Sequence, residues 1–178
     1  MKQRIREKAL KLRNSTENQG EKSSKICQRL KQLKEFKEAK SVLLYWSIHS
    51  EVKTHELVNE LIGKKEVYLP FTMKHTLGWA SVTSTKDLKR GMFKILEPVR
   101  IQAGPPDLVV IPGVAYDEDG NRLGRGKGFY DRTLGEIDAP KIALAFESQI
   151  IGDVSSDHRD QPMDIIITEK RIIDCRMR

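Results

Sequence analysis

Three basic residues alternate with glycines in one short segment of the chain. The segment consists of Arg122, Leu123, Gly124, Arg125, Gly126, Lys127, Gly128, Phe129 and Tyr130. Glycine lets the backbone approach a ligand closely and turn its N–H groups toward it, while the arginines and the lysine supply positive charge. A helix expected to begin near Gly128 adds the partial positive charge of its N-terminus. The pattern favours a polyphosphate ligand, and its alternatives are a solvated basic loop and a nucleic-acid contact.

Two common phosphate-binding motifs do not fit this segment. A Walker A loop needs Ser or Thr after its lysine, but Gly128 follows Lys127, and Asn121 stands where the first glycine is required. The dinucleotide fingerprint needs GxGxxG at the start of a helix, whereas this chain has GxGxG with basic residues inserted. The sequence therefore argues against a P-loop enzyme and against an NAD site.

Asp131 falls in the first turn of the expected helix, directly after Phe129 and Tyr130. A carboxylate at this position could hold a divalent cation over bound phosphates. It could equally cap the helix, because an acidic side chain is favourable near a helix N-terminus. The local sequence leaves both roles open.

The elements around this segment alternate between strands and helices. Short runs that are apolar on both faces occupy residues 42–46, 67–69, 108–111, 142–146 and 165–167. Such runs are typical of strands covered on both sides in a mostly parallel sheet. A helical pattern over 54–62 separates the first two runs, which indicates an α/β fold with an open, mostly parallel sheet flanked by helices. Between residues 72 and 106 we expect antiparallel strands and irregular connections.

The net charge of +7 is concentrated at the N-terminus. Residues 1–40 hold 13 Lys and Arg against 5 Asp and Glu, and the remainder holds 19 against 20. We expect two basic helices there, the first over 2–13 and the second capped by Ser15 or Thr16. The expected apolar positions of these helices are Ile5, Ala9 and Leu12, then Ile26, Leu30, Leu33 and Phe36. We expect most of these basic side chains to lie on the solvent-exposed faces of the two helices.

Several classes of protein are excluded by composition. No run approaches the roughly 20 apolar residues that span a bilayer, and no apolar core of signal-peptide type follows the basic N-terminus. Cys27 and Cys175 are isolated, without metal-ligand spacing, so we expect reduced thiols rather than a disulfide or structural metal. These features predict a cytoplasmic protein with no membrane partner.

Longer stretches of the sequence resemble a known family. Two segments resemble the signature of the 5-formyltetrahydrofolate cyclo-ligases. They are residues 112–117 (Pro-Gly-Val-Ala-Tyr-Asp) and 122–132 (Arg-Leu-Gly-Arg-Gly-Lys-Gly-Phe-Tyr-Asp-Arg). Three further segments match family positions in the same order. They are Lys2-x3-Arg6, the segment 41–54 with its Glu-Val-x-Thr, and the segment 160–164 (Asp-Gln-Pro-Met-Asp). The resemblance thus covers nearly the whole chain.

The resemblance implies an enzyme that uses ATP and Mg²⁺ to convert 5-formyltetrahydrofolate into 5,10-methenyltetrahydrofolate, releasing ADP and phosphate. It implies that the nucleotide contacts are Lys2, Arg6 and the segment 122–130. Because cations stabilise the charge that develops during phosphoryl transfer, we expect Arg125 and Lys127 to act in catalysis. The implied substrate contacts are Trp46, Glu51, Arg125, Gly126, Lys127, Gly128 and Phe129. Asp131 and Asp164 match the magnesium ligands of the family.

The family also implies a fold like that of the sugar-phosphate isomerase and coenzyme A transferase group. We expect one domain over 1–178, with the helices of 1–40 packed on the α/β core, acting as a monomer on 5-formyltetrahydrofolate and its polyglutamates. One alternative is a nucleic-acid-binding module built on the basic helices and the Arg-Gly-Lys-Gly loop. Another is a related ligase for a different N-formyl compound, because Phe129 replaces the Tyr usual in this family.

Overall fold

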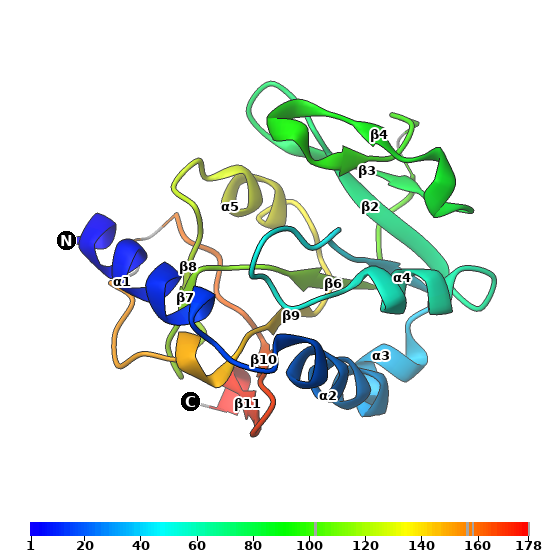
Figure 1. Ribbon diagram of the computed structural model, residues 1–178. Coiled ribbons are helices and arrows are strands. Elements are labelled where there is room, and N and C mark those ends of the chain that lie inside the picture. The colour runs from blue at the N-terminus through cyan, green and yellow to red at the C-terminus, as the bar shows by residue number, and fades with distance from the viewer. Residues whose placement is uncertain (102, 156, 158, 178) are drawn as a thin grey trace.

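The structure is a computed structural model that describes residues 1–101, 103–155, 157 and 159–177. Within these residues, seven strands form one sheet in the order β11-β10-β9-β6-β1-β2-β3 (Figure 1). The strands are β1 (Ser41–Leu43), β2 (Glu66–Thr72), β3 (Leu77–Ser81), β6 (Leu108–Ile111), β9 (Lys141–Leu144), β10 (Ile165–Ile167) and β11 (Ile172–Asp174). The inner five are mutually parallel, and β3 and β11 are antiparallel edges.

The five strands expected from apolar runs all lie in this sheet, and the α/β fold class is confirmed. The reason is burial on both faces: every residue of β6 and of β10 is buried. Alternate side chains enter two different cores. Val110 and Ile142 point into one, and Val109 and Ala143 into the other.

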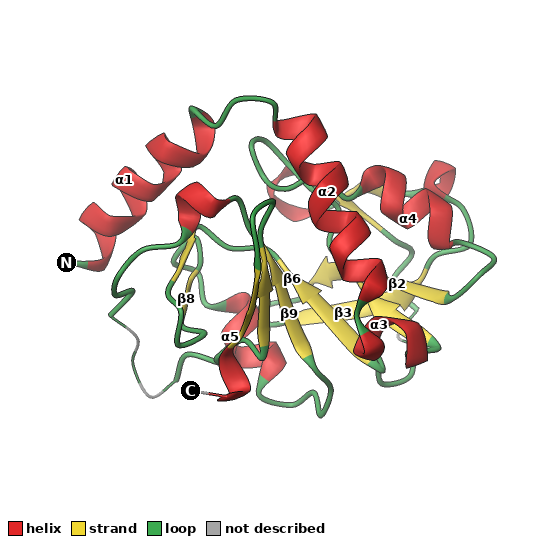
Figure 2. Ribbon diagram, turned by 90° about the horizontal axis from the view of Figure 1, so that it is seen from below, coloured by secondary structure: helices red, strands yellow, loops and turns green. Residues whose placement is uncertain are grey.

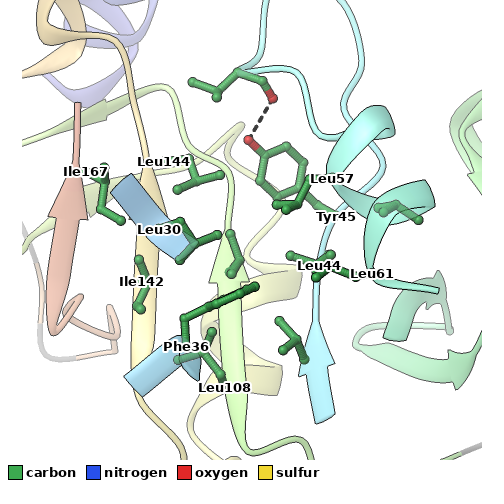
Figure 3. Close-up of a cluster of buried hydrophobic side chains, with 14 of the residues drawn as sticks. Leu30, Phe36, Leu44, Tyr45, Leu57, Leu61, Leu108, Ile142, Leu144 and Ile167 are labelled. Carbon is green, nitrogen blue, oxygen red and sulfur yellow. Dashed lines mark hydrogen bonds between the residues drawn. The ribbon is translucent and has the colours of Figure 1, made fainter. Parts of the chain in front are cut away.

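Helices cover the two faces unequally. They are α1 (Lys2–Asn14), α2 (Gln19–Gln32), α3 (Lys34–Glu38), α4 (His55–Leu61) and α5 (Phe129–Leu134). The first face is packed by α2, α3 and α4, through residues such as Leu30, Phe36 and Leu57 (Figure 3). The hydroxyl of Tyr45 in this core donates a hydrogen bond to the carbonyl oxygen of Val52 at 2.9 Å. The second face is packed by α5, and α1 lies beside the sheet next to β8 (Figure 2).

The N-terminal helices differ from the prediction in three ways. The second helix begins after Asn18, not after Ser15 or Thr16, because the Thr16 hydroxyl is bonded to the Leu12 carbonyl and to Ser148. The helix also breaks at Leu33, whose extended backbone separates α2 from α3. In α1, Leu12 is 40% exposed and Arg13 is buried in its place.

Besides the pair β10 and β11, three antiparallel strand pairs occur in the described residues, and each contributes residues to the region at the carboxyl ends of the central strands. The first is formed by β2 and β3, the second by β4 (Lys89–Arg90) and β5 (Leu96–Glu97), and the third by β7 (Ala115–Tyr116) and β8 (Arg122–Leu123). The first two bear out the antiparallel strands expected between 72 and 106. The third leads directly into the basic glycine segment and α5. Among the described residues, no helix combines the length and apolar character needed to cross a membrane.

Candidate active site

A cavity of about 920 Å³ opens at the carboxyl ends of β1, β2 and β6. This is the edge of an α/β sheet where loops and helix N-termini usually meet a ligand. Fourteen of the fifteen residues predicted for the site line it. They are Lys2, Arg6, Trp46, Glu51, Arg122, Leu123, Gly124, Arg125, Gly126, Lys127, Gly128, Phe129, Tyr130 and Asp131. Segments that are far apart in sequence therefore converge as expected.

The glycine loop is held against the first turns of α1. Gly126 has φ +96°, and an added Cβ would lie 3.4 Å from the Arg6 guanidinium. The Nε of Arg6 donates a hydrogen bond to the Gly124 carbonyl at 2.9 Å. A side chain at position 126 would therefore strain the backbone and crowd Arg6.

Lys2 does not project freely into solvent. Its ammonium pairs with Asp160 at 2.9 Å and with Asp157 at 3.3 Å, at the rim of the cavity. The hydrogen bond to Asp160 is the main cause of a raised pKa of Lys2, opposed by partial desolvation. Two carboxylates therefore hold the charged Lys2 side chain at the rim of the cavity.

Arg122 and Asp131 form the innermost ion pair of the cavity. The side chain of Arg122 is 3% exposed, its Nη2 donates to Asp131 Oδ1 at 2.9 Å, and its Nη1 donates to the Pro112 carbonyl at 3.3 Å. Its Nε is buried and has no hydrogen-bond partner in the described structure. A buried donor without a partner is costly.

Glu51 and Arg125 pair across the cavity. Arg125 Nη2 lies 3.2 Å from Glu51 Oε1, and the backbone N–H of Ile48 donates to the other oxygen at 2.9 Å. The Glu51 side chain is 8% exposed, whereas that of Arg125 is 45% exposed. Glu51 is thus the fixed partner and Arg125 the one with room to move.

Trp46 presents an aromatic wall beside Glu51. Its ring stacks on His55 of α4 with 3.8 Å between centroids and 12° between planes. The His55 Nε2 lies 2.8 Å from the Ser47 carbonyl oxygen, which holds the imidazole in place. The stack braces the indole ring of a residue that lines the cavity, so a flat ligand would meet a preformed surface.

Asp164 does not reach the cavity. Its Oδ2 accepts a hydrogen bond from the backbone N–H of Lys141 at 2.7 Å, where β9 begins, and it precedes β10. This is the amino edge of the parallel strands, opposite the cavity. The expected convergence of Asp131 and Asp164 is therefore absent, because the backbone donor at the start of β9 takes up the Asp164 carboxylate.

Magnesium ordinarily binds one or two carboxylates together with substrate phosphates. Asp131 fits that requirement, since both of its hydrogen bonds in the described structure go to Oδ1 and its Oδ2 receives none. Asp164 does not fit it. No group of three His, Cys, Asp or Glu side chains suited to a metal occurs in the part of the chain that the structure describes.

Sequence reasoning missed several residues of this region, among them the carboxylates Asp157 and Asp160 at the rim of the cavity. Phe93, in the turn between β4 and β5, lines the cavity with its ring 6.1 Å from that of Phe129. Nothing in its sequence neighbourhood marks it, because the turn is irregular. Arg13 is buried behind Glu51, but in sequence it resembles the other cations of a basic helix.

The fold and the site together define a class: an α/β protein in which one cavity combines a basic, glycine-rich loop suited to an anion with an aromatic and acidic wall suited to a flat ligand. The model of the 5-formyltetrahydrofolate cyclo-ligase family matches residues 1–169, and the chain belongs to this family. The predicted family is thereby confirmed, and with it the predicted class of enzyme.

Relatives and solved structures agree with this assignment. A 5-formyltetrahydrofolate cyclo-ligase of Haemophilus influenzae is 35% identical, over 93% of this chain and 97% of its own length. A 5,10-methenyltetrahydrofolate synthetase structure from Aquifex aeolicus is 36% identical with a TM-score of 0.88, covering 98% of this chain and 93% of that one. A synthetase from Mycoplasma pneumoniae has a TM-score of 0.76 at 26% identity, covering 94% and 98%.

Proposed function

We propose that this chain uses ATP to close the ring of 5-formyltetrahydrofolate, with nucleotide and folate bound side by side in the one cavity. The family membership supports the reaction, and a single observation supports its location. The basic loop of 122–130 and the wall formed by Trp46 and Glu51 face the same cavity. A phosphoryl group held by the loop would therefore lie close to a folate on the wall.

The reaction requires the formyl carbon, which is a poor electrophile, to become a good one. The formyl oxygen attacks the γ-phosphorus of ATP, an O–P bond forms, the bond to the β-phosphate oxygen breaks, and ADP leaves. The N10 amine then attacks the formyl carbon of the resulting iminium phosphate and loses its proton to solvent. Breaking of the C–O bond releases inorganic phosphate and leaves the 5,10-methenyl ring.

The loop residues stabilise the charge that develops on the transferring phosphoryl group. Positioned cations and N–H donors perform this task without a covalent nucleophile. We assign Arg125 and Lys127 to it, because both line the cavity and the side chain of Arg125 is 45% exposed. Lys2 and Arg6 hold the nucleotide at the rim of the cavity.

Glu51 and Trp46 form the folate side of the site. A carboxylate suits the paired N–H donors of a pterin edge, and an indole ring suits its face. In the present arrangement Arg125 occupies Glu51 Oε1. Binding of the pterin would therefore displace Arg125 from Glu51 and release it toward the phosphoryl group.

A magnesium ion, when bound with ATP, would neutralise part of the phosphate charge, and Asp131 is the residue placed to hold it. Further proposals follow from the family: a monomer that acts in the cytoplasm and accepts polyglutamylated folate. Light scattering should then give a mass near 20.4 kDa.

The test is turnover of 5-formyltetrahydrofolate by the purified protein with ATP and Mg²⁺, followed by the near-ultraviolet absorbance of the methenyl product. Lys127→Ala should lower kcat at least about tenfold while the thermal transition stays in place. Absence of product with the unaltered chain would overturn the proposal. Faster turnover of a simpler N-formyl compound than of the folate would assign the same cavity to a different substrate.

A further inference from the structure

Arg13 is a charged side chain buried at the last turn of α1. It is 2% exposed, although α1 is otherwise a basic surface helix. Its Nε donates to the Ser50 hydroxyl at 2.9 Å, and its Nη1 donates to the Gly113 carbonyl at 3.1 Å. Both acceptors are neutral. A buried guanidinium with neutral partners is costly, so the position calls for an explanation.

Two charged residues of the active site act electrostatically on this guanidinium. Burial lowers the pKa of the Arg13 guanidinium, the negative charge of Glu51 opposes that shift, and the positive charge of Arg125 adds to it. The Arg13 guanidinium bonds Ser50, the residue directly before Glu51. Arg125 contacts Glu51 directly from the cavity, and Arg13 acts on it from the protein interior.

Arg13 also joins two backbone segments that shape the folate side. Ser50 directly precedes Glu51 in a turn closed by a 3.1 Å hydrogen bond from the Glu51 N–H to the Ile48 carbonyl. Ser50 is bonded in addition to Asn14, the residue after Arg13. Gly113 follows the end of β6 on the floor of the cavity. The guanidinium thus fastens the Glu51 turn to that floor.

We propose that Arg13 is a positioning residue for the folate side: it fixes the Ser50–Glu51 turn and keeps a permanent positive charge behind Glu51 when Arg125 leaves for the phosphoryl group. The inference rests on the proposed role of Glu51. It assigns two tasks to the one helix. Lys2 and Arg6 at its start serve the nucleotide, and Arg13 at its end serves the folate.

The experiment is a double-mutant cycle of Arg13→Gln with Glu51→Gln, measuring kcat and the KM for each substrate in the intact chain. If Arg13 acts through Glu51, Arg13→Gln alone should raise the KM for 5-formyltetrahydrofolate about tenfold, the effect of losing a hydrogen bond to a charged group. The KM for ATP should change by less than about twofold. In the Glu51→Gln background, the same change should add less than about twofold, because coupled residues are not additive.

Two milder variants keep the proposal testable if Arg13→Gln fails to fold. Arg13→Lys retains the charge and should recover most of the folate KM. Ser50→Ala removes one acceptor and should raise the folate KM about threefold, again without an added effect in Glu51→Gln. Two outcomes would show that Arg13 has a merely structural role. One is additive effects of Arg13→Gln and Glu51→Gln on the folate KM, and the other is an equal rise in both KM values together with a lower Tm. Glu51→Gln without any effect on the folate KM would overturn both the role of Glu51 and this inference, whereas an inactive unaltered chain would overturn the proposed function itself.

Discussion

The ammonium of Lys127 lies 3.5 Å from the centre of the Phe93 ring, so the lysine proposed for catalysis rests on an aromatic face. Phe93 is brought there by an unusual turn, in which both it and Lys94 have φ +60°. The turn is anchored by Glu97, whose buried carboxylate accepts a hydrogen bond from the Thr72 N–H at 2.9 Å. A cation on a ring keeps its full charge, and Lys127 therefore remains available to a phosphate.

Replacing Phe93 with Leu should strengthen nucleotide binding. The cation–π contact stabilises the ligand-free position of Lys127 by about 0.5–1 kcal/mol, and this is lost when Lys127 moves to a phosphate. The Kd for a non-hydrolysable ATP analogue, measured by calorimetry, should fall about two- to fivefold. Met92→Leu, at the neighbouring exposed position, is the control and should leave the Kd unchanged. Weaker nucleotide binding by Phe93→Leu would mean that the ring stays in contact with the bound complex.

The two aspartates expected to bind magnesium should behave differently. Asp131→Asn should raise the Mg²⁺ concentration for half-maximal turnover about tenfold and lower the free energy of unfolding by about 1–3 kcal/mol, since Arg122 loses its buried counter-charge. Asp164→Asn should leave the Mg²⁺ requirement unchanged and lower the free energy of unfolding by about 1 kcal/mol, through a weaker bond to the Lys141 N–H. Magnesium titrations and denaturant unfolding measure both. A raised Mg²⁺ requirement in Asp164→Asn would restore Asp164 to the metal site.

The contrast between these aspartates shows how far sequence reasoning reaches. The strands could be predicted because burial on both faces leaves continuous apolar runs such as 108–111, and the glycine segment could be predicted because its chemistry is local. Asp164 matches a family position, but its role depends on which edge of the sheet it occupies. That edge is decided by strand register, and the pairing of Ile165 with Ile142 leaves Asp164 beside the Lys141 N–H.

The burial of Arg13 is a second feature that could not be predicted from the sequence. The helical pattern of Ile5, Ala9 and Leu12 places the buried stripe on apolar residues, and an arginine is usually assigned to solvent. The stripe instead continues from Ala9 to Arg13, four residues on, because Ser50 and Gly113 offer acceptors there. Those acceptors come from remote segments, so no local pattern could have shown them.

The thiol of Cys27 should react slowly at neutral pH. Burial raises the pKa of Cys27 to about 11, and the thiol donates to the Lys53 carbonyl. Because only the thiolate is nucleophilic, about one molecule in a thousand is reactive at pH 8. In a Cys175→Ser background, the alkylation rate should rise about tenfold for each pH unit up to about pH 11. Unfolding in urea should abolish the protection, and rapid alkylation of the folded chain at pH 7 would contradict it.

Gly126→Ala should impair nucleotide binding more than it impairs folding. An alanine at φ +96° costs about 1–2 kcal/mol of backbone strain, and its Cβ would meet the Arg6 guanidinium at 3.4 Å. The loop can relieve both by shifting, which removes the N–H groups and Arg6 from their positions around the phosphates. We therefore expect the KM for ATP to rise at least about tenfold, with the free energy of unfolding lowered by about 1–2 kcal/mol. Gly152→Ala is the matched control, because its φ lies outside the left-handed region and nothing lies within 4 Å of an added Cβ. An ATP KM equal to that of the unaltered chain in Gly126→Ala would show that the left-handed loop conformation is not needed for the nucleotide.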